Sequence, residues 1–160
     1  MENIENKFWS ISLYIDKDNN LIGIPCGKSE KYTVSDIDTV LTLKAPYEQN
    51  RVESFIEEVV NACYTKEHND NFDYSTIEKY TKIKGFVEAT RKYTLITIIK
   101  TQDNYSIMPT FNDYEKGPIV IDDDEVILPK DYVKGELAKV IFGMIDIYGK
   151  ANFAQLEDDE

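Results

Sequence analysis

The chain has 160 residues, 42% of them hydrophobic, so it is long enough to bury the core of one domain. A formal net charge of −12, from 30 acidic and 18 basic residues, disfavours contact with phosphate backbones and favours a cationic partner, although solubility alone also explains it. The start has neither a basic segment nor an apolar run, and the apolar runs elsewhere are too short to span a membrane. We therefore expect a cytoplasmic protein.

The first elements form a strand-rich segment. Residues 8–15 alternate in polarity, which predicts a strand whose buried face carries Trp9, Ile11, Leu13 and Ile15. The polar turn at 16–20 leads to a returning strand at 21–24, completing a hairpin. Pro25 then begins a loop, and a third short strand is expected at 40–43.

The first long helix is predicted from about residue 51 to residue 64. Asn50 is a suitable N-cap, with Glu53 three residues further on. Apolar side chains recur at helical spacing and should pack on the sheet: Val52, Phe55, Ile56, Val59, Val60 and Cys63. The acidic residues between them are expected on the opposite, exposed face: Glu53, Glu57 and Glu58.

A polar junction at 66–73 separates this segment from a second one. Ser75 and Glu78 form a capping box, so a short helix should begin there and end before Gly85. Residues 86–89 read as a strand. Residues 93–99 are rich in β-branched and aromatic residues and apolar on both faces, which predicts a central strand.

The remaining elements are a hairpin, two short strands and a helix. A strand at 105–108 returns along the central strand, and strands at 119–121 and 125–128 flank an acidic turn. A final helix is expected over about 132–148, with Asp131 as its cap and Gly149 at its end.

The two parts of the chain have similar sequence patterns at a nearly constant offset. Pro25 and Pro109 are 84 positions apart (109 − 25), Val40 and Val126 are 86 apart (126 − 40), and the apolar stripes of the two long helices are 85 apart (137 − 52). We therefore predict an α+β fold with a mainly antiparallel sheet, helices packed on it, and two pseudo-repeated strand–strand–helix halves at about 8–66 and 84–149. A single domain should cover 1–152, followed by an acidic tail at 153–160.

Catalytic chemistry finds little support. The only histidine, His68, could be paired with Cys26 or Cys63 as base and nucleophile. Cys63 points to the core by helical spacing, however, and no activity signature surrounds either cysteine, so buried free thiols are the simpler interpretation. We expect no catalytic residues and no disulfide.

Metal and cofactor sites are also not expected. The segment 16–20 begins like a calcium loop, but Leu21 and Gly27 stand where that motif needs glycine and glutamate. Consecutive acids at 122–125 do not converge on one point, and the sequence has neither a glycine-rich phosphate loop nor paired zinc-like cysteines. We expect no metal and no cofactor.

Two binding functions remain. A sheet bearing some of the 11 tyrosines could stack nucleic-acid bases, but basic residues are scattered and outnumbered, so we expect no nucleic-acid partner and keep this as the alternative. Protein binding through acidic surfaces is favoured. The expected contacts are Asp122, Asp123, Asp124 and Glu125 with Asp113 and Glu115, and secondarily Glu53, Glu57 and Glu58.

Several segments resemble CdiI-type immunity proteins of bacterial contact-dependent growth inhibition systems. The resemblance is carried by Leu21–Pro25, Leu41–Pro46, Asn61–Cys63, Ser75–Phe86, Tyr105–Thr110, Val126–Pro129 and Glu136–Ile141. It spans about residues 8–148, with one departure at Ala138, where the family often has glycine.

This resemblance implies a function. Such proteins stay in the cytosol and bind the toxin domain of a neighbouring effector, and many of these toxins are nucleases with basic surfaces. The resemblance therefore implies that the partner is a cognate toxin domain, a nuclease with a basic surface, held in a one-to-one complex. The family carries no fixed binding residues, since each member matches its own toxin.

Overall fold

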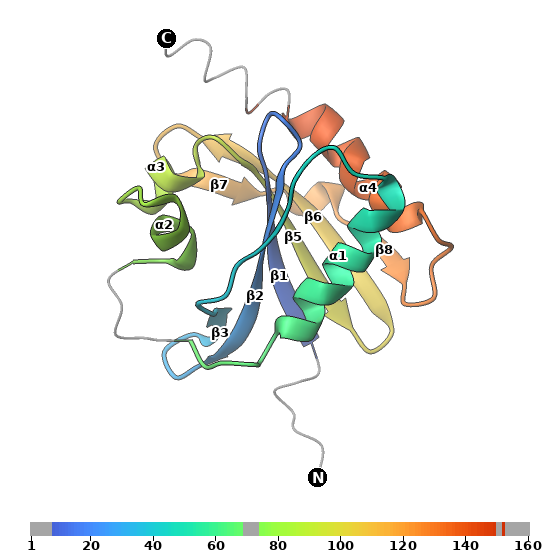
Figure 1. The fold of residues 1–160 in the computed structure, drawn as a ribbon, viewed down its shortest axis with the longest axis horizontal. Helices are drawn as coiled ribbons and strands as arrows, with labels where there is room; N and C mark the ends of the chain where they lie inside the picture. Colours follow the sequence, from blue (N-terminus) through green and yellow to red (C-terminus); the bar gives the residue numbers. More distant parts are fainter. Residues whose placement is uncertain (1–7, 69–73, 150–151, 153–160) are drawn as a thin grey trace.

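A computed structural model describes residues 8–68, 74–149 and 152 as a curled antiparallel sheet with four helices packed on it (Figure 1). The expected α+β class is confirmed. The strands are β1 (Phe8–Ile15), β2 (Leu21–Ser29), β3 (Thr33–Asp36), β4 (Leu41–Leu43), β5 (Thr94–Thr101), β6 (Asn104–Asp113), β7 (Gly117–Val120) and β8 (Val126–Pro129). The helices are α1 (Gln49–Ala62), α2 (Thr76–Thr81), α3 (Phe86–Thr90) and α4 (Glu136–Met144).

The strand order is β3-β2-β1-β5-β6-β7, with β4 paired to β2 and β8 paired to β6. The predicted central strand is confirmed, because β5 pairs with β1 on one side and β6 on the other. The two parts of the chain share a pairing order: Ile37 donates its N–H to Pro25 O at 3.0 Å, and Ile121 donates to Pro109 O at 3.0 Å. The duplication itself stays a prediction.

The main core lies between the sheet and the two long helices, α1 and α4. The apolar stripe predicted for α1 is buried throughout, from Val52 to Val60. It packs against alternate strand residues: Ile11, Leu13, Ile15, Ile96, Ile98 and Ile107. Burial of this face accounts for the stability of both helices, because amphipathic helices are held mainly by packing.

A second, smaller core occupies the other face at one end of the sheet. Tyr14 and Leu95 point to this face because they alternate with the residues of the main core. Ile77 of α2 and Ala89 of α3 cover them. The short helices α2 and α3 therefore belong to the face opposite α1 and α4.

The rest of that second face is open to solvent. Direct cross-strand partners form a row of Ser10, Ile99, Ser106 and Ile127 across β1, β5, β6 and β8. A parallel row contains Ser12, Thr97 and Met108. All seven side chains are partly or fully exposed, whereas their neighbours along each strand are mostly buried. We call these seven residues the open sheet face.

Several element predictions were wrong. The strand expected to end before Pro25 continues as β2 to Ser29, because β3, which was not foreseen, pairs with its second half. Residues predicted as a strand at 86–89 form helix α3 after Gly85, whose φ is +97°. The α1 cap is Glu48, without a side-chain cap bond, rather than Asn50.

The final helix also begins later than expected. Gly135, with φ +100°, takes the cap position predicted for Asp131, and α4 passes into a π-helical turn at Ile145–Gly149. The acidic tail predicted at 153–160 and residues 69–73 of the junction lie outside the described residues. Within the described ranges, every helix is too short or too polar to cross a lipid bilayer.

Candidate partner-binding surface

The acidic run at 122–125 forms one exposed turn between β7 and β8. Asp122, Asp123 and Asp124 make a single 3-10 turn and are exposed, as is Glu125. Backbone N–H groups of Asp124 and Glu125 donate to Ile121 O and Asp122 O at 3.2 and 3.1 Å. We call residues 122–125 the acidic turn; it presents four carboxylates on a fixed backbone.

Glu125 connects the acidic turn to the open sheet face. Its carboxylate accepts a hydrogen bond of 2.6 Å from the Ser106 hydroxyl on β6. Ser106 lies directly across from Ile127, which is 58% exposed. A partner that contacts the acidic turn would therefore also meet an exposed aliphatic side chain.

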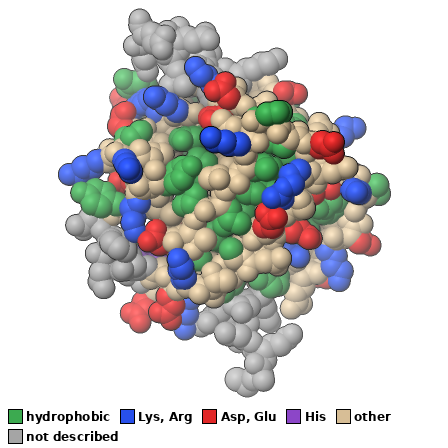
Figure 2. All heavy atoms as spheres, viewed as in Figure 1, with side chains coloured by type: hydrophobic (Ala, Val, Ile, Leu, Met, Phe, Trp, Pro, Cys, Tyr) green, Lys and Arg blue, Asp and Glu red, His purple; other side chains and the backbone are tan. Residues whose placement is uncertain are grey.

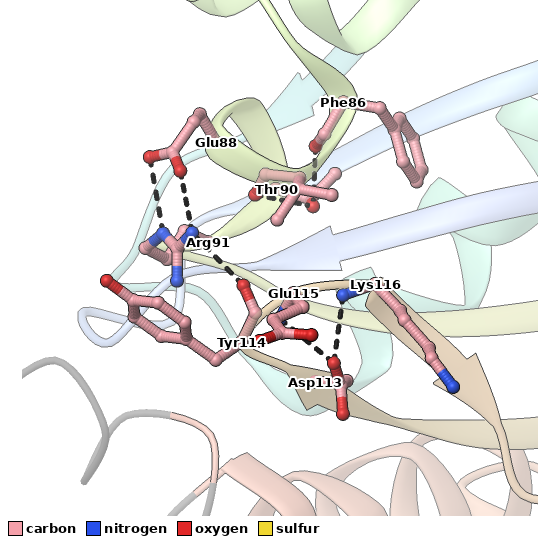
Figure 3. Close-up of polar contacts among 9 residues, drawn as sticks. Phe86, Glu88, Thr90, Arg91, Asp113, Tyr114, Glu115 and Lys116 are labelled. Carbon is pink, nitrogen blue, oxygen red and sulfur yellow. Dashed lines mark hydrogen bonds and ion pairs between the residues drawn. The ribbon is translucent and has the colours of Figure 1, made fainter.

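Asp113 is the last residue of β6, and Glu115 lies in the turn that leads from it to β7 (Figure 3). The Asp113 carboxylate accepts hydrogen bonds from the backbone N–H groups of Lys116 and Glu115 at 2.8 and 2.9 Å. These bonds lower the pKa of Asp113 below its ordinary value. Asp113 thus stabilises its own turn, while Glu115 is exposed.

A basic side chain is fixed beside this turn. Arg91, next to the end of α3, pairs with Glu88 at 2.6 Å and donates to Tyr114 O at 3.3 Å. Its guanidinium lies 4.3 Å from the centre of the Tyr114 ring. Figure 3 shows the Arg91 and Tyr114 side chains next to each other. Because acidic and basic side chains lie together around this turn, it should attract a cationic partner less strongly than the acidic turn does.

Glu53 is not on an exposed face, contrary to expectation. It is 8% exposed, and its carboxylate accepts hydrogen bonds from the N–H groups of Gly135 at 2.9 Å and Ala138 at 3.0 Å. The unpaired N–H groups at the start of α4 attract this carboxylate into the space between the two long helices. Its side chain serves the fold by joining the two long helices.

The other two glutamates of α1 are exposed, as expected, but differ in surroundings. Glu58 forms an ion pair with Arg51 at 3.2 Å. Glu57 lies close enough to Tyr105 and Tyr132 to add to the rise in their pKa, which burial mainly causes. The acidic residues predicted as contacts thus form separate groups, and the acidic turn is the densest.

The face that carries α1 shows a mixed surface. In Figure 2, acidic and basic side chains are interspersed around hydrophobic and uncharged ones on this side of the molecule. A run of one charge, such as the acidic turn, is therefore a better candidate for recognising a charged partner than this face.

The residues considered for nucleophilic chemistry are occupied by structural contacts. Cys26 and Cys63 are free, buried thiols that both contact the backbone of Ser10: its N–H donates to Cys26 Sγ at 3.3 Å, and Cys63 Sγ donates to its carbonyl at 3.7 Å. The hydrogen bond between the two thiols lowers the pKa of Cys26, while the same bond and burial raise the pKa of Cys63. The His68 ring lies 2.6 Å from Asp36 O, so it faces the β3 backbone.

Asp36 on β3 is a titratable group that could not be recognised from the sequence. Burial raises the pKa of Asp36 on β3 to about 6, although the charge of His68 and a hydrogen bond from Ser12 oppose this shift. Because Ser12 belongs to the open sheet face, Asp36 borders that face on the side opposite the acidic turn. Asp36 could not be assigned to a buried site because the strand that carries it, β3, was not predicted.

Metal coordination has no geometric support in residues 8–68, 74–149 and 152. Among them, His, Cys, Asp and Glu side chains do not gather in groups of three or more that could hold an ion. Asp16, which begins the calcium-like segment, instead accepts from the N–H groups of Asp18 and Asn20 at 2.9 Å and closes the β1–β2 turn.

Comparison with known proteins shows similarity in fold. No family model and no curated protein matches the sequence. A Neisseria meningitidis structure described as a protein of unknown function, NMB0488, matches with a TM-score of 0.65 and 12% identity over 91% of this chain and 98% of that one. A chain in a CdiA-CT/CdiI toxin and immunity complex from Yersinia pseudotuberculosis matches with a TM-score of 0.61 and 10% identity, over 88% and 97%.

Proposed function

We propose that this chain is an immunity protein that binds and neutralises the toxin domain of a contact-dependent growth inhibition effector. The observation that carries the proposal is the fold similarity to a chain of a toxin and immunity complex, which extends over 88% of this chain and 97% of the other. The sequence resemblance to the same class of proteins, drawn from segments between residues 21 and 141, points in the same direction.

Charge supports a basic partner. The chain has a net charge of −12, and the acidic turn concentrates four carboxylates at one exposed place. A nuclease toxin carries cations where it holds its nucleic acid, so an acidic protein can compete for that surface. Opposite charges would accelerate encounter, and packed apolar contacts would set the lifetime of the one-to-one complex.

Inhibition by binding needs no chemistry from the chain. The buried thiols of Cys26 and Cys63, and the His68 ring against the β3 backbone, fit structural roles better than catalytic ones. The inhibitor would act by covering the active site of the toxin or a surface that its substrate needs.

The proposal is tested by co-expression with the terminal toxin domain of the effector encoded beside this chain. We expect growth to be rescued, and the two purified proteins to elute together in size-exclusion chromatography at equal molar amounts. A control strain receives the toxin with an unrelated acidic protein of similar size. Absence of rescue and of complex formation would refute the immunity function.

Nucleic-acid binding is a second candidate, favoured by one local observation. Residues 74–92 contain five basic residues (Lys79, Lys82, Lys84, Arg91, Lys92) against two acidic ones (Glu78, Glu88), unlike the chain as a whole. Tyr80 and Phe86 are 45% and 40% exposed in the same segment. Stacking on such aromatics with nearby lysines is how single strands are held. A filter-binding assay at low salt that retains no single-stranded DNA or RNA would exclude this candidate.

A further inference from the structure

We propose that the open sheet face, together with the acidic turn, is the surface on which a basic toxin domain docks. This inference rests on the proposed function and names its docking surface. The face consists of Ser10, Ser12, Thr97, Ile99, Ser106, Met108 and Ile127, all uncharged and all at least partly exposed. Its apolar members are Ile99, Met108 and Ile127, which lie on three neighbouring strands.

The face is a rigid template. Four hydrogen-bonded strands carry it, and the residues that alternate with it point into the main core, so neither the strands nor their register can shift without disturbing that core. An antiparallel sheet usually carries polar side chains where one of its faces is open to solvent. Here the row through Ser10 and Ser106 also includes Ile99 and the 58% exposed Ile127.

The open sheet face is too small to form a stable interface by itself. Three strand spacings of about 4.8 Å and a length of about 14 Å give an area of about 200 Å², about a quarter of the roughly 800 Å² that each partner buries in a standard interface. The flanking residues must therefore contribute. On the β8 side these include the acidic turn, which the hydrogen bond from the Ser106 hydroxyl to the Glu125 carboxylate joins to the face.

The charge of the acidic turn indicates which kind of molecule docks here. Four exposed carboxylates beside an uncharged centre match a surface with lysines and arginines next to an apolar patch. A second copy of this chain would instead bring like charges together, on a molecule whose net charge is already −12. The chemistry therefore favours a basic protein domain.

The test compares two identical substitutions at matched positions. Ile127→Lys places a cation on the open sheet face, and Ile147→Lys places one on the π-helical turn after α4, where Ile147 is 67% exposed. Because both variants change the net charge equally, long-range electrostatics cancel in the comparison. Binding of the purified terminal toxin domain is measured by isothermal titration calorimetry, after circular dichroism has verified folding.

We expect Ile127→Lys to raise Kd at least tenfold and Ile147→Lys to change it less than about twofold. The milder pair Ile127→Ser and Ile147→Ser repeats the comparison if a lysine variant fails to fold. If wild type binds the toxin domain and both variants bind equally well, the docking surface is wrong while the immunity function stands. If wild type does not bind, the immunity function fails. A wild-type dimer that Ile127→Lys dissociates in sedimentation analysis would assign the face to a second copy and overturn the inference.

Discussion

The carboxylate of Glu53 on α1 accepts a hydrogen bond of 3.0 Å from the backbone N–H of Ala138 on α4. The same side chain accepts from Gly135, so one buried carboxylate serves two N–H groups at the start of a helix that lies more than 80 residues further along the chain. The start of α4 is thus capped by another helix rather than by its own sequence, and the two long helices are joined by a charged group.

Removing this carboxylate should destabilise the protein. Glu53→Ala leaves buried N–H donors without an acceptor and deletes a negative charge at a helix N-terminus, so we expect a loss of about 2–3 kcal/mol. The measurement is urea unfolding followed by circular dichroism. Glu58→Ala on the same helix is the control, because the exposed Glu58–Arg51 pair should contribute less than about 1 kcal/mol. Equal losses in both variants would contradict the capping role.

The acidic turn should govern the rate of association with a basic toxin domain. Reversing Asp122, Asp123 and Asp124 to lysine should lower the association rate constant about 10- to 100-fold at low salt and reduce its salt dependence. The measurement is stopped-flow or surface plasmon resonance at two ionic strengths. A control triple at Asp18, Glu67 and Asp146, which are also exposed, makes the same change in net charge elsewhere. Equal effects of the two triples would show that only total charge matters.

Stability should depend on pH through Asp36. Its pKa is raised from 3.8 to about 6 in the folded state, so between these values the native protein binds more protons than the unfolded chain. Stability from this group is therefore full at low pH and lost as pH rises through about 6. Asp36→Asn should be more stable than wild type at pH 8, by up to about 3 kcal/mol, and similar to it at pH 4.

Urea unfolding of Asp36→Asn and wild type at both pH values measures this difference. Asp38→Asn provides the control for loss of one carboxylate, because the Asp38 side chain is 57% exposed where it pairs with Lys79. A difference between Asp36→Asn and wild type that stays constant from pH 4 to pH 8 would contradict the assignment.

Two glycine substitutions should have opposite effects. A Cβ at Gly27 on β2 would lie 2.2 Å from Ile37 Cγ2 and 2.4 Å from the carbonyl oxygen of Lys66, so Gly27→Ala should cost about 1–3 kcal/mol. A Cβ at Gly143 in α4 would meet no described neighbour within 4 Å beyond the helix itself, so Gly143→Ala should add about 0.5–1 kcal/mol. Thermal unfolding compares the two; a destabilised Gly143→Ala would refute the helix argument.

Local patterns explain what could be predicted from the sequence. Helical spacing identified the buried stripe of α1, and the capping box was found where Ser75 accepts from Glu78 N–H and Glu78 accepts from Ser75 N–H. Apolar residues on both faces marked β5 as central. Each of these signals is contained in a short window, so tertiary context does not need to be known.

Long-range contacts explain what could not be predicted. The strand β3, with the sequence Thr-Val-Ser-Asp, lacks an apolar period and forms because β2 offers an unpaired edge. Helical spacing placed Glu53 on the exposed face of α1. Its burial depends on hydrogen bonds from Gly135 and Ala138, which are distant in sequence and could not be foreseen. The open sheet face could not be predicted from the sequence either, because it depends on which part of the second face α2 and α3 cover.

The place of β1 in the sheet has a consequence for synthesis on the ribosome. β1 is an interior strand, and its pairing with β5 joins Phe8 to Thr101 and Ile15 to Thr94. One edge of the earliest strand therefore waits for a partner until about residue 101 has left the exit tunnel. Until then the nascent chain should remain incompletely folded and accessible to chaperones.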